Sequence, residues 1–149
     1  MRTKKTVRWE RLDNAAKIFP SASDKDRTQV FRFSCELTEP VEKEVLQRAV
    51  DKTLEDFPLY RSVLKRGLFW YYLEESNLKP EVELENQPPC SPIYDRNQKN
   101  LLFRVLYYKN RIHLEVYHVL SDGTGALQFL RALISYYLAI RYDFTAVST

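Results

Sequence analysis

The sequence predicts an α/β fold of the α+β class, a two-layer sandwich in which a mostly antiparallel sheet carries two helices on one face. Short segments of alternating apolar and polar residues indicate strands, and two longer segments repeat apolar residues at the helical period. Aromatic residues form 13% of the 149 residues, and ten of them are Tyr, a composition that suits a sheet. In order along the chain, the predicted elements are β-α-β-β-β-β-β-α.

The first third of the chain predicts one strand followed by one helix. Residues 7–20 are partly apolar without a clean period, and residues 21–27 predict a polar loop. Residues 30–37 alternate in the way that a strand does. A helix follows from Pro40 to Phe57, because proline is tolerated in a first helical turn and Pro58 stops the apolar stripe.

The middle of the chain predicts a hairpin, an edge strand and a loop. Residues 61–64 and 68–73 predict two strands around the turn at residues 65–67, which contains a glycine. Residues 82–84 alternate apolar residues with a glutamate and predict a short edge strand. Residues 86–100 contain three prolines and predict a long irregular loop.

The last third of the chain predicts a second hairpin, a final helix and a tail. Strands at residues 101–108 and 111–118 are joined by Lys109 and Asn110, and Asn110 is expected in the left-handed conformation of a tight turn. The final helix runs to Tyr142 with apolar residues at helical spacing on one side. Residues 143–149 are expected to form a tail.

The last predicted strand decides the positions of both histidines. Ile112, Leu114 and Val116 point to one face of the sheet, and His113 points to the other. By this parity His118 lies on the apolar face at the last step of the strand, where we expect a half-buried imidazole. We expect His113 to be a solvated cross-strand residue on the polar face.

Composition excludes several classes of protein. A net charge of +3, with no basic run interleaved with aromatics, argues against a nucleic-acid partner. No apolar run approaches the roughly 20 residues that a membrane span needs, and no signal peptide is visible. Cys35 and Cys90 form no CxxC pair, which is typical of a reduced, cytoplasmic protein. We expect residues 1–149 to form a single domain.

The six residues from His118 to Gly123 spell H-x-x-x-D-G at the junction of the last strand and the last helix. This segment resembles the active-site motif of CoA-dependent acyltransferases of the chloramphenicol acetyltransferase type. That superfamily also contains the condensation domains of peptide synthetases and the alcohol acyltransferases. Residues 11–16, 115–118 and 125–130 are most similar to the alcohol acetyltransferase branch. The resemblance to residues 11–16 leads us to expect that the true N-terminus is present.

The resemblance implies the N-terminal half of such an acyltransferase and its chemistry. That chemistry is transfer of an acyl group from a thioester co-substrate, acetyl-CoA or another acyl thioester, to a small-molecule alcohol or amine, without a bound cofactor or metal. An O-acetyltransferase is the leading interpretation. The alternatives are a condensation-domain relative acting on carrier-bound acyl groups, and a non-catalytic half-domain that binds a partner. Self-association or a complementary second half is expected to complete the site.

His118 is the candidate catalytic residue. Acyl transfer needs a base that removes the proton of the attacking hydroxyl or amine, and imidazole suits this role because its ordinary pKa lies near neutral pH. The alternative is a strand-end histidine that is hydrogen-bonded within the core. A metal site is disfavoured because further ligands at fixed spacing are lacking.

Three neighbours of His118 complete the candidate site. Asp122 is expected to be structural, either as a helix N-cap or, as the resemblance implies, through a pair with an arginine for which Arg11 and Arg32 are guesses. Gly123 is either a permissive turn residue or, by the resemblance, leaves room for the pantetheine arm. Ser121 suggests a serine triad, which we disfavour because the G-x-S-x-G elbow is absent.

Overall fold

The structure is a computed structural model that describes residues 15–24 and 26–142. Arg11, the similarity at residues 11–14 and the expected tail at residues 143–149 lie outside the described residues.

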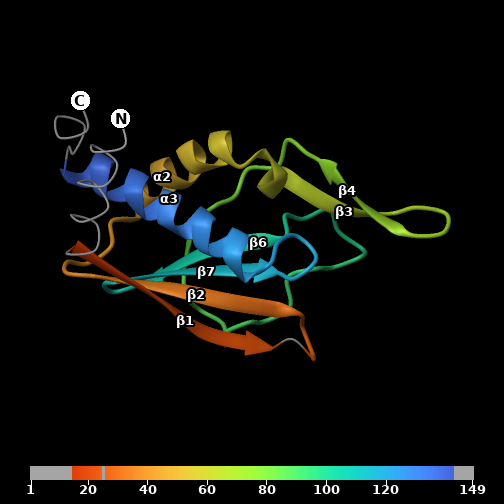
Figure 1. The fold of residues 1–149 in the computed structure, drawn as a ribbon, viewed down its shortest axis with the longest axis horizontal. Coiled ribbons are helices and arrows are strands. Elements are labelled where there is room, and N and C mark those ends of the chain that lie inside the picture. Colours follow the sequence, from red (N-terminus) through yellow and green to blue (C-terminus); the bar gives the residue numbers. More distant parts are fainter. Residues whose placement is uncertain (1–14, 25, 143–149) are drawn as a thin grey trace.

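A five-stranded sheet forms the centre of the fold (Figure 1). Its order is β1-β2-β7-β6-β5, and neighbours are antiparallel except for β5 and β6, which are parallel. The prediction of a mostly antiparallel sheet is therefore confirmed. The strands are β1 (Ala16–Asp24), β2 (Val30–Leu37), β5 (Glu83–Leu84), β6 (Phe103–Tyr108) and β7 (Arg111–Tyr117).

Two helices, α2 (Lys43–Asp56) and α3 (Gly123–Tyr142), lie over one face of this sheet (Figure 1). Both bury their apolar stripes against the helix-facing residues of the central strands, which include Cys35, Ile112 and Leu114. Tyr137 of α3 joins the two helices, because its hydroxyl accepts a hydrogen bond from the N–H of Glu42, the N-cap residue of α2 (3.0 Å). This contact satisfies one of the backbone donors that every helix start leaves open.

A separate hairpin, β3 (Ser62–Arg66) and β4 (Tyr71–Glu75), extends away from the sheet and helices (Figure 1). The predicted hairpin is confirmed, but its turn lies at residues 67–70 rather than 65–67. The N–H of Gly67 donates to the carbonyl of Trp70 (2.7 Å). A Cβ at Gly67 would lie 2.8 Å from that oxygen, so glycine is required by the close approach of the two chains. Leu68, Phe69 and Trp70 are 89%, 82% and 70% exposed.

Three local predictions are wrong. Residues 16–24 form β1 instead of an irregular lead-in and loop, and the register of β1 slips between Pro20 and Ala22, which breaks the alternation that marks a strand. The first helix begins at Lys43, three residues after Pro40. In the β6–β7 turn, Lys109 has the positive φ (54°), while Asn110 donates its side-chain amide to the carbonyl of Leu37 (2.8 Å).

Among the described residues, no helix is long and apolar enough to cross a membrane.

Candidate functional site

His118 follows the last residue of β7 and lies in the turn that leads to α3. Its backbone N–H donates a hydrogen bond to the carbonyl of Gln29 (2.7 Å), in the turn between β1 and β2. The strand ends one residue earlier than predicted, because Gln29 has left the extended conformation (φ 56°). The side chain of His118 is exposed, so the expected half-buried imidazole is a wrong prediction.

The imidazole of His118 nevertheless lies on the helix-facing side of the sheet, as parity predicted. Its ring meets the edge of Phe31 (centroids 5.9 Å apart, planes at 78°), and Phe31 meets Phe33 in the same way (6.1 Å, 89°). A Cβ on Gly123 would find Phe33 as its nearest neighbour, at 4.0 Å. Packing within the described residues therefore does not explain the missing side chain of Gly123. The aromatic rings form an apolar surface beside His118 and Gly123, which are both exposed.

Asp122 forms the N-cap of α3. Its Oδ1 accepts a hydrogen bond from the N–H of Gly125 (2.8 Å), which satisfies an open donor in the first helical turn. The hydroxyl of Ser121 donates to the carbonyl of Asp122 (3.2 Å). A Cβ on Gly125 would lie 2.4 Å from that hydroxyl oxygen, so the tight turn explains this glycine.

Asp122 has no arginine partner among the described residues. Arg32, one of the two guesses, is instead paired with Glu85 and Glu115 on the opposite face of the sheet. The guess fails because alternate residues of β2 face opposite sides, and Arg32 faces away from the motif. Arg11, the other guess, lies outside the described residues.

Tyr60 lies beside the motif turn, and sequence reasoning missed it. Its ring stacks on Phe129 of α3 (4.1 Å, 9°), and its hydroxyl is buried without a hydrogen bond of ordinary geometry among the described residues. The pKa of Tyr60 is raised to about 12, mainly by burial. The hydroxyl of Ser121 opposes this rise, and the charge of Asp122 adds to it. Some sixty residues separate Tyr60 from the motif, so no local pattern indicates this contact.

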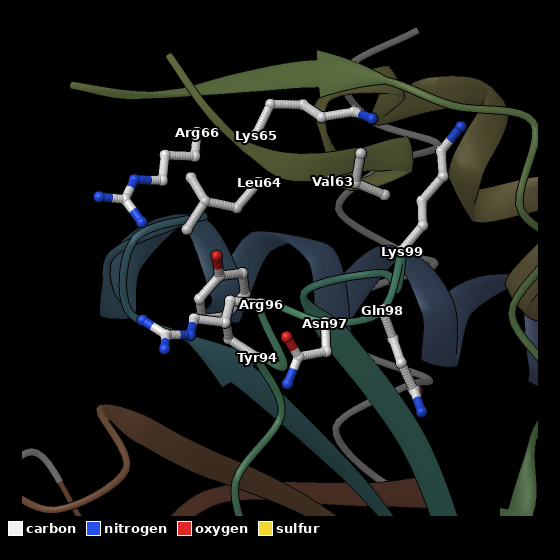
Figure 2. Close-up of a pocket in the computed structure, with 9 residues that line it drawn as sticks. All are labelled: Val63, Leu64, Lys65, Arg66, Tyr94, Arg96, Asn97, Gln98 and Lys99. Atoms are coloured by element: carbon white, nitrogen blue, oxygen red, sulfur yellow. The ribbon is translucent and has the colours of Figure 1, made fainter. Parts of the chain in front are cut away.

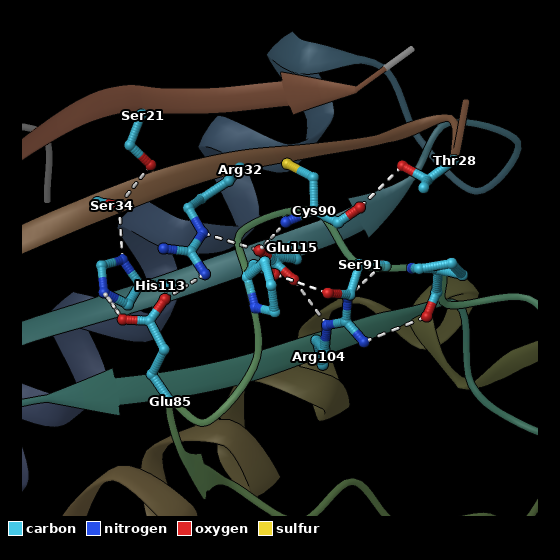
Figure 3. A network of polar contacts seen from close by, with 12 residues as sticks. Ser21, Thr28, Arg32, Ser34, Glu85, Cys90, Ser91, Arg104, His113 and Glu115 are labelled. Carbon is cyan, nitrogen blue, oxygen red and sulfur yellow. Dashed lines mark hydrogen bonds and ion pairs between the residues drawn. The ribbon is translucent and has the colours of Figure 1, made fainter. Parts of the chain in front are cut away.

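The opposite face of the sheet carries a buried polar network (Figure 3). Glu115 is fully buried and accepts hydrogen bonds from the Nε atoms of Arg32 (2.8 Å) and Arg104 (2.6 Å). Arg32 also forms an ion pair with Glu85 (2.6 Å). The buried Glu115 is thus paired with two arginines, and the buried Arg32 is paired with two carboxylates. This arrangement offsets the cost of removing these charges from water.

His113 belongs to this network, and the expectation of a solvated side chain is wrong. Only 5% of the residue is exposed. Its Nδ1 is hydrogen-bonded to the hydroxyl of Ser34 (2.7 Å), and its Nε2 lies 3.4 Å from Glu85. Burial, followed by the charge of Arg32, lowers the pKa of His113. The predicted irregular loop crosses this face (Figure 3), and this cover contributes to the burial of its polar side chains.

Contacts of Cys90 connect this loop to the backbone that holds His118. Cys90 has a positive φ of 62°, and its N–H donates to Glu115 (2.7 Å). Its carbonyl accepts a hydrogen bond from the hydroxyl of Thr28 (2.8 Å), one residue before Gln29. Burial raises the pKa of the Cys90 thiol and raises that of Cys35 to about 12. Burial therefore disfavours the reactive thiolate form of both cysteines.

Comparison with known proteins identifies relatives of this fold. No family model and no curated protein matches the chain. Among solved structures, the starter condensation domain of rhizomide synthetase RzmA matches with a TM-score of 0.63 and 11% identity, over 96% of this chain and 38% of that one. SgcC5 from Streptomyces globisporus matches with a TM-score of 0.59 and 16% identity, over 76% of this chain and 30% of that one.

A variant of the RzmA domain also matches, with a TM-score of 0.63 and 11% identity, over 78% of this chain and 33% of that one. The chain thus spans about a third of the length of the structures that it matches. At these identities the likeness concerns the fold alone. The mixed α+β fold of this chain is similar to part of a condensation domain.

Proposed function

We propose that this chain is the N-terminal, two-layer half of an acyltransferase of the chloramphenicol acetyltransferase and condensation-domain type, with His118 as its general base. The observation that carries the proposal is the exposed imidazole at the end of β7, inside H-x-x-x-D-G, in a chain with a condensation-domain-like fold. The reaction transfers an acyl group from a thioester to an alcohol or amine. Acetyl-CoA is the leading donor and an alcohol the leading acceptor, as in the alcohol acetyltransferase branch.

In the proposed reaction His118 accepts a proton from the attacking group and later donates it to the leaving thiolate. A ring nitrogen accepts the proton of the attacking hydroxyl or amine while the nucleophile bonds to the thioester carbonyl carbon. When the tetrahedral intermediate collapses, the carbon–sulfur bond breaks and the thiolate takes the proton from the imidazolium. The proton and the electron pairs balance without any further reactant.

The apolar surface beside His118 supports this role. Phe31 and Phe33 lie on one side of the site, so a bound acyl chain excludes water from that side. Water is the competing nucleophile, and its exclusion favours transfer over hydrolysis. Asp122 and Gly125 fix the geometry of the turn through the N-cap hydrogen bond, and Gly123 leaves space beside Phe33.

A donor held on a carrier protein is the second candidate. Its support is the set of structural neighbours that are condensation domains. The same base and the same proton transfers serve both donors, because each presents a thioester.

A further protein segment or a second subunit completes the site in this proposal. The chain spans about a third of the structures that it matches, and the side of His118 that faces away from Phe31 is open. Orientation of two substrates contributes several kcal/mol to catalysis only in a shielded channel. Light scattering after size-exclusion chromatography tests this part, and a clean monomer with enzyme-like turnover contradicts it.

Replacement of His118 by alanine tests the proposed base. Thiol release from acetyl-CoA in the presence of acceptor is expected to fall by at least about 100-fold, with an unchanged melting temperature because the side chain is exposed. Thr124→Ala, at an exposed position in the first turn of α3, is the matched control and is expected to retain turnover. Full turnover in His118→Ala contradicts the proposal.

A further inference from the structure

A pocket of about 410 Å³ lies between the β3–β4 hairpin and residues 94–99 (Figure 2). Lys65 and Arg66 of β3 line one wall, and Arg96 and Lys99 line the other. Arg66 and Arg96 extend toward the same side of the pocket from opposite walls (Figure 2). Two segments about thirty residues apart in sequence thus bring four cationic side chains to one cavity.

These four cations are not neutralised within the part of the chain that the structure describes. None of them forms an ion pair there, and none of the described lining residues is an Asp or Glu. The cross-strand partners of Lys65 and Arg66 are Tyr72 and Tyr71, so the hairpin itself supplies no acid opposite them.

The nearest acid in sequence is not among the residues that line the pocket. Asp95 precedes Arg96, but its carboxylate accepts a hydrogen bond from the backbone N–H of Asn97 (2.9 Å). Four like charges around one cavity repel one another, and they raise the local concentration of anions. An anionic ligand of matching size relieves this repulsion.

The pocket lies at the same end of the sheet as His118. Tyr94, one of its lining residues, stacks on Tyr117 (5.7 Å, 22°), and Tyr117 directly precedes His118. Tyr71 of the hairpin contributes to a raised pKa of Tyr117, after burial and Tyr94. An anion in this pocket would therefore lie near the end of β7, which is the end of the sheet where His118 lies.

We propose that this pocket binds the phosphate of the pantetheine arm that carries the acyl thioester, an assignment that rests on the proposed acyl transfer. Guanidinium groups bind phosphate oxygens in bidentate geometry, and Arg66 and Arg96 supply two of them from opposite walls. A pantetheine arm separates its phosphate from its sulfur, which agrees with a phosphate pocket at a distance from His118. Coenzyme A and a carrier-bound arm share this phosphate ester.

Calorimetric titration of the purified protein at low ionic strength tests the assignment. The probes are inorganic pyrophosphate, coenzyme A, 4′-phosphopantetheine and pantetheine, which lacks phosphate. The Arg66→Gln/Arg96→Gln protein is expected to bind the three phosphorylated probes at least tenfold more weakly than the wild type does. Pantetheine is expected to bind both proteins equally. Both arginines are exposed, so an unchanged melting temperature shows that the variant is folded.

A control variant that removes the same number of positive charges elsewhere distinguishes a specific binding site from a general electrostatic effect. Arg48 and Lys52 are exposed on α2, and Arg48→Gln/Lys52→Gln is expected to bind all four probes as the wild type does. Equal losses in the two double variants overturn the assignment, as does unchanged affinity in Arg66→Gln/Arg96→Gln. Binding of pyrophosphate without binding of 4′-phosphopantetheine or coenzyme A overturns the pantetheine arm as the ligand.

The relative affinities also distinguish the two sources of the arm. Equal affinity for 4′-phosphopantetheine and coenzyme A supports recognition of the phosphate that a carrier-bound arm shares, and tighter binding of coenzyme A supports recognition of its nucleotide end. The two proposals fail separately. If the phosphorylated probes bind as expected but His118→Ala retains full turnover, the proposed base is wrong and the phosphate pocket stands.

Discussion

The backbone N–H of His118 donates to the carbonyl oxygen of Gln29, a non-glycine residue in the left-handed conformation. The position of His118 therefore depends on a turn between β1 and β2 that is remote from it in sequence. Thr28 ties the same turn to Cys90, and Cys90 is tied to Glu115. The candidate base and the buried network are thus connected through hydrogen bonds that involve the backbone and the side chains of Thr28 and Glu115.

We expect Gln29→Val to destabilise the fold by on the order of 1–2 kcal/mol, because a β-branched residue is strained at a positive φ. Gln29→Gly is expected to be neutral or slightly stabilising, since glycine adopts this conformation freely. Urea denaturation measures both changes. Arg27→Val, in the same turn but without a positive φ, is the control and should change stability by less than about 0.5 kcal/mol. A milder effect of Gln29→Val than of Arg27→Val contradicts the strain.

The N-cap of α3 predicts different outcomes for two substitutions of Asp122. Asp122→Ala removes the hydrogen bond to Gly125 and is expected to cost about 1 kcal/mol, whereas Asp122→Asn preserves the cap. Melting temperature and urea midpoint measure both. If Asn proves as damaging as Ala, the negative charge of Asp122 has a partner beyond the described residues, and the cap is not its main role.

The buried network and a surface ion pair on the same sheet offer a direct comparison. Glu115 is fully buried between two arginines. Glu115→Ala is expected to cost about 3–5 kcal/mol, because it leaves Arg104 without its acidic partner and the buried Arg32 with Glu85 alone. Glu36 pairs with Arg111, and their side chains are 42% and 50% exposed. Glu36→Ala is expected to cost less than about 1 kcal/mol. Similar losses in the two variants would contradict the role of the network.

The lowered pKa of His113 predicts how stability depends on pH. Burial and the charge of Arg32 hold this pKa below its ordinary value of 6.5, so the unfolded chain binds more protons once the pH falls below that value. The contribution of His113 is therefore fully present above about pH 6.5 and is lost as the pH falls toward its folded pKa. Urea midpoints between pH 8 and pH 5 measure this effect. His113→Gln is expected to lose less stability than the wild type over that range, and parallel curves would contradict the shift.

Sequence patterns predicted the elements with clear periodicity. The strands at β2, β6 and β7 and the helices α2 and α3 were all predicted, because their apolar residues repeat at the strand or helix period. β1 was missed because Pro20 and a register slip interrupt its alternation. The hairpin of β3 and β4 was predicted from Gly67, but its turn was placed two residues too early.

The sequence predicted only those parts of the candidate site that depend on residues close together in the chain. The H-x-x-x-D-G segment indicated His118 and the N-cap role of Asp122. The contact between Tyr60 and the motif turn, and the burial of His113, depend on segments that meet only in the folded chain. One signal was available for His113: Arg32, Arg104 and Glu115 are opposite charges on the polar faces of predicted strands, a pattern that also fits a covered face.

The pairing of β2 with β7 determines when this fold can form. Arg32 and Glu115 are 83 residues apart in sequence, and their strands are the two central neighbours in the order β1-β2-β7-β6-β5. Closing so long a loop costs chain entropy before any contact is gained. During synthesis β2 therefore cannot pair with β7 until β7 has left the ribosome. Until then its apolar side chains, which include Phe31 and Phe33, are accessible to chaperones.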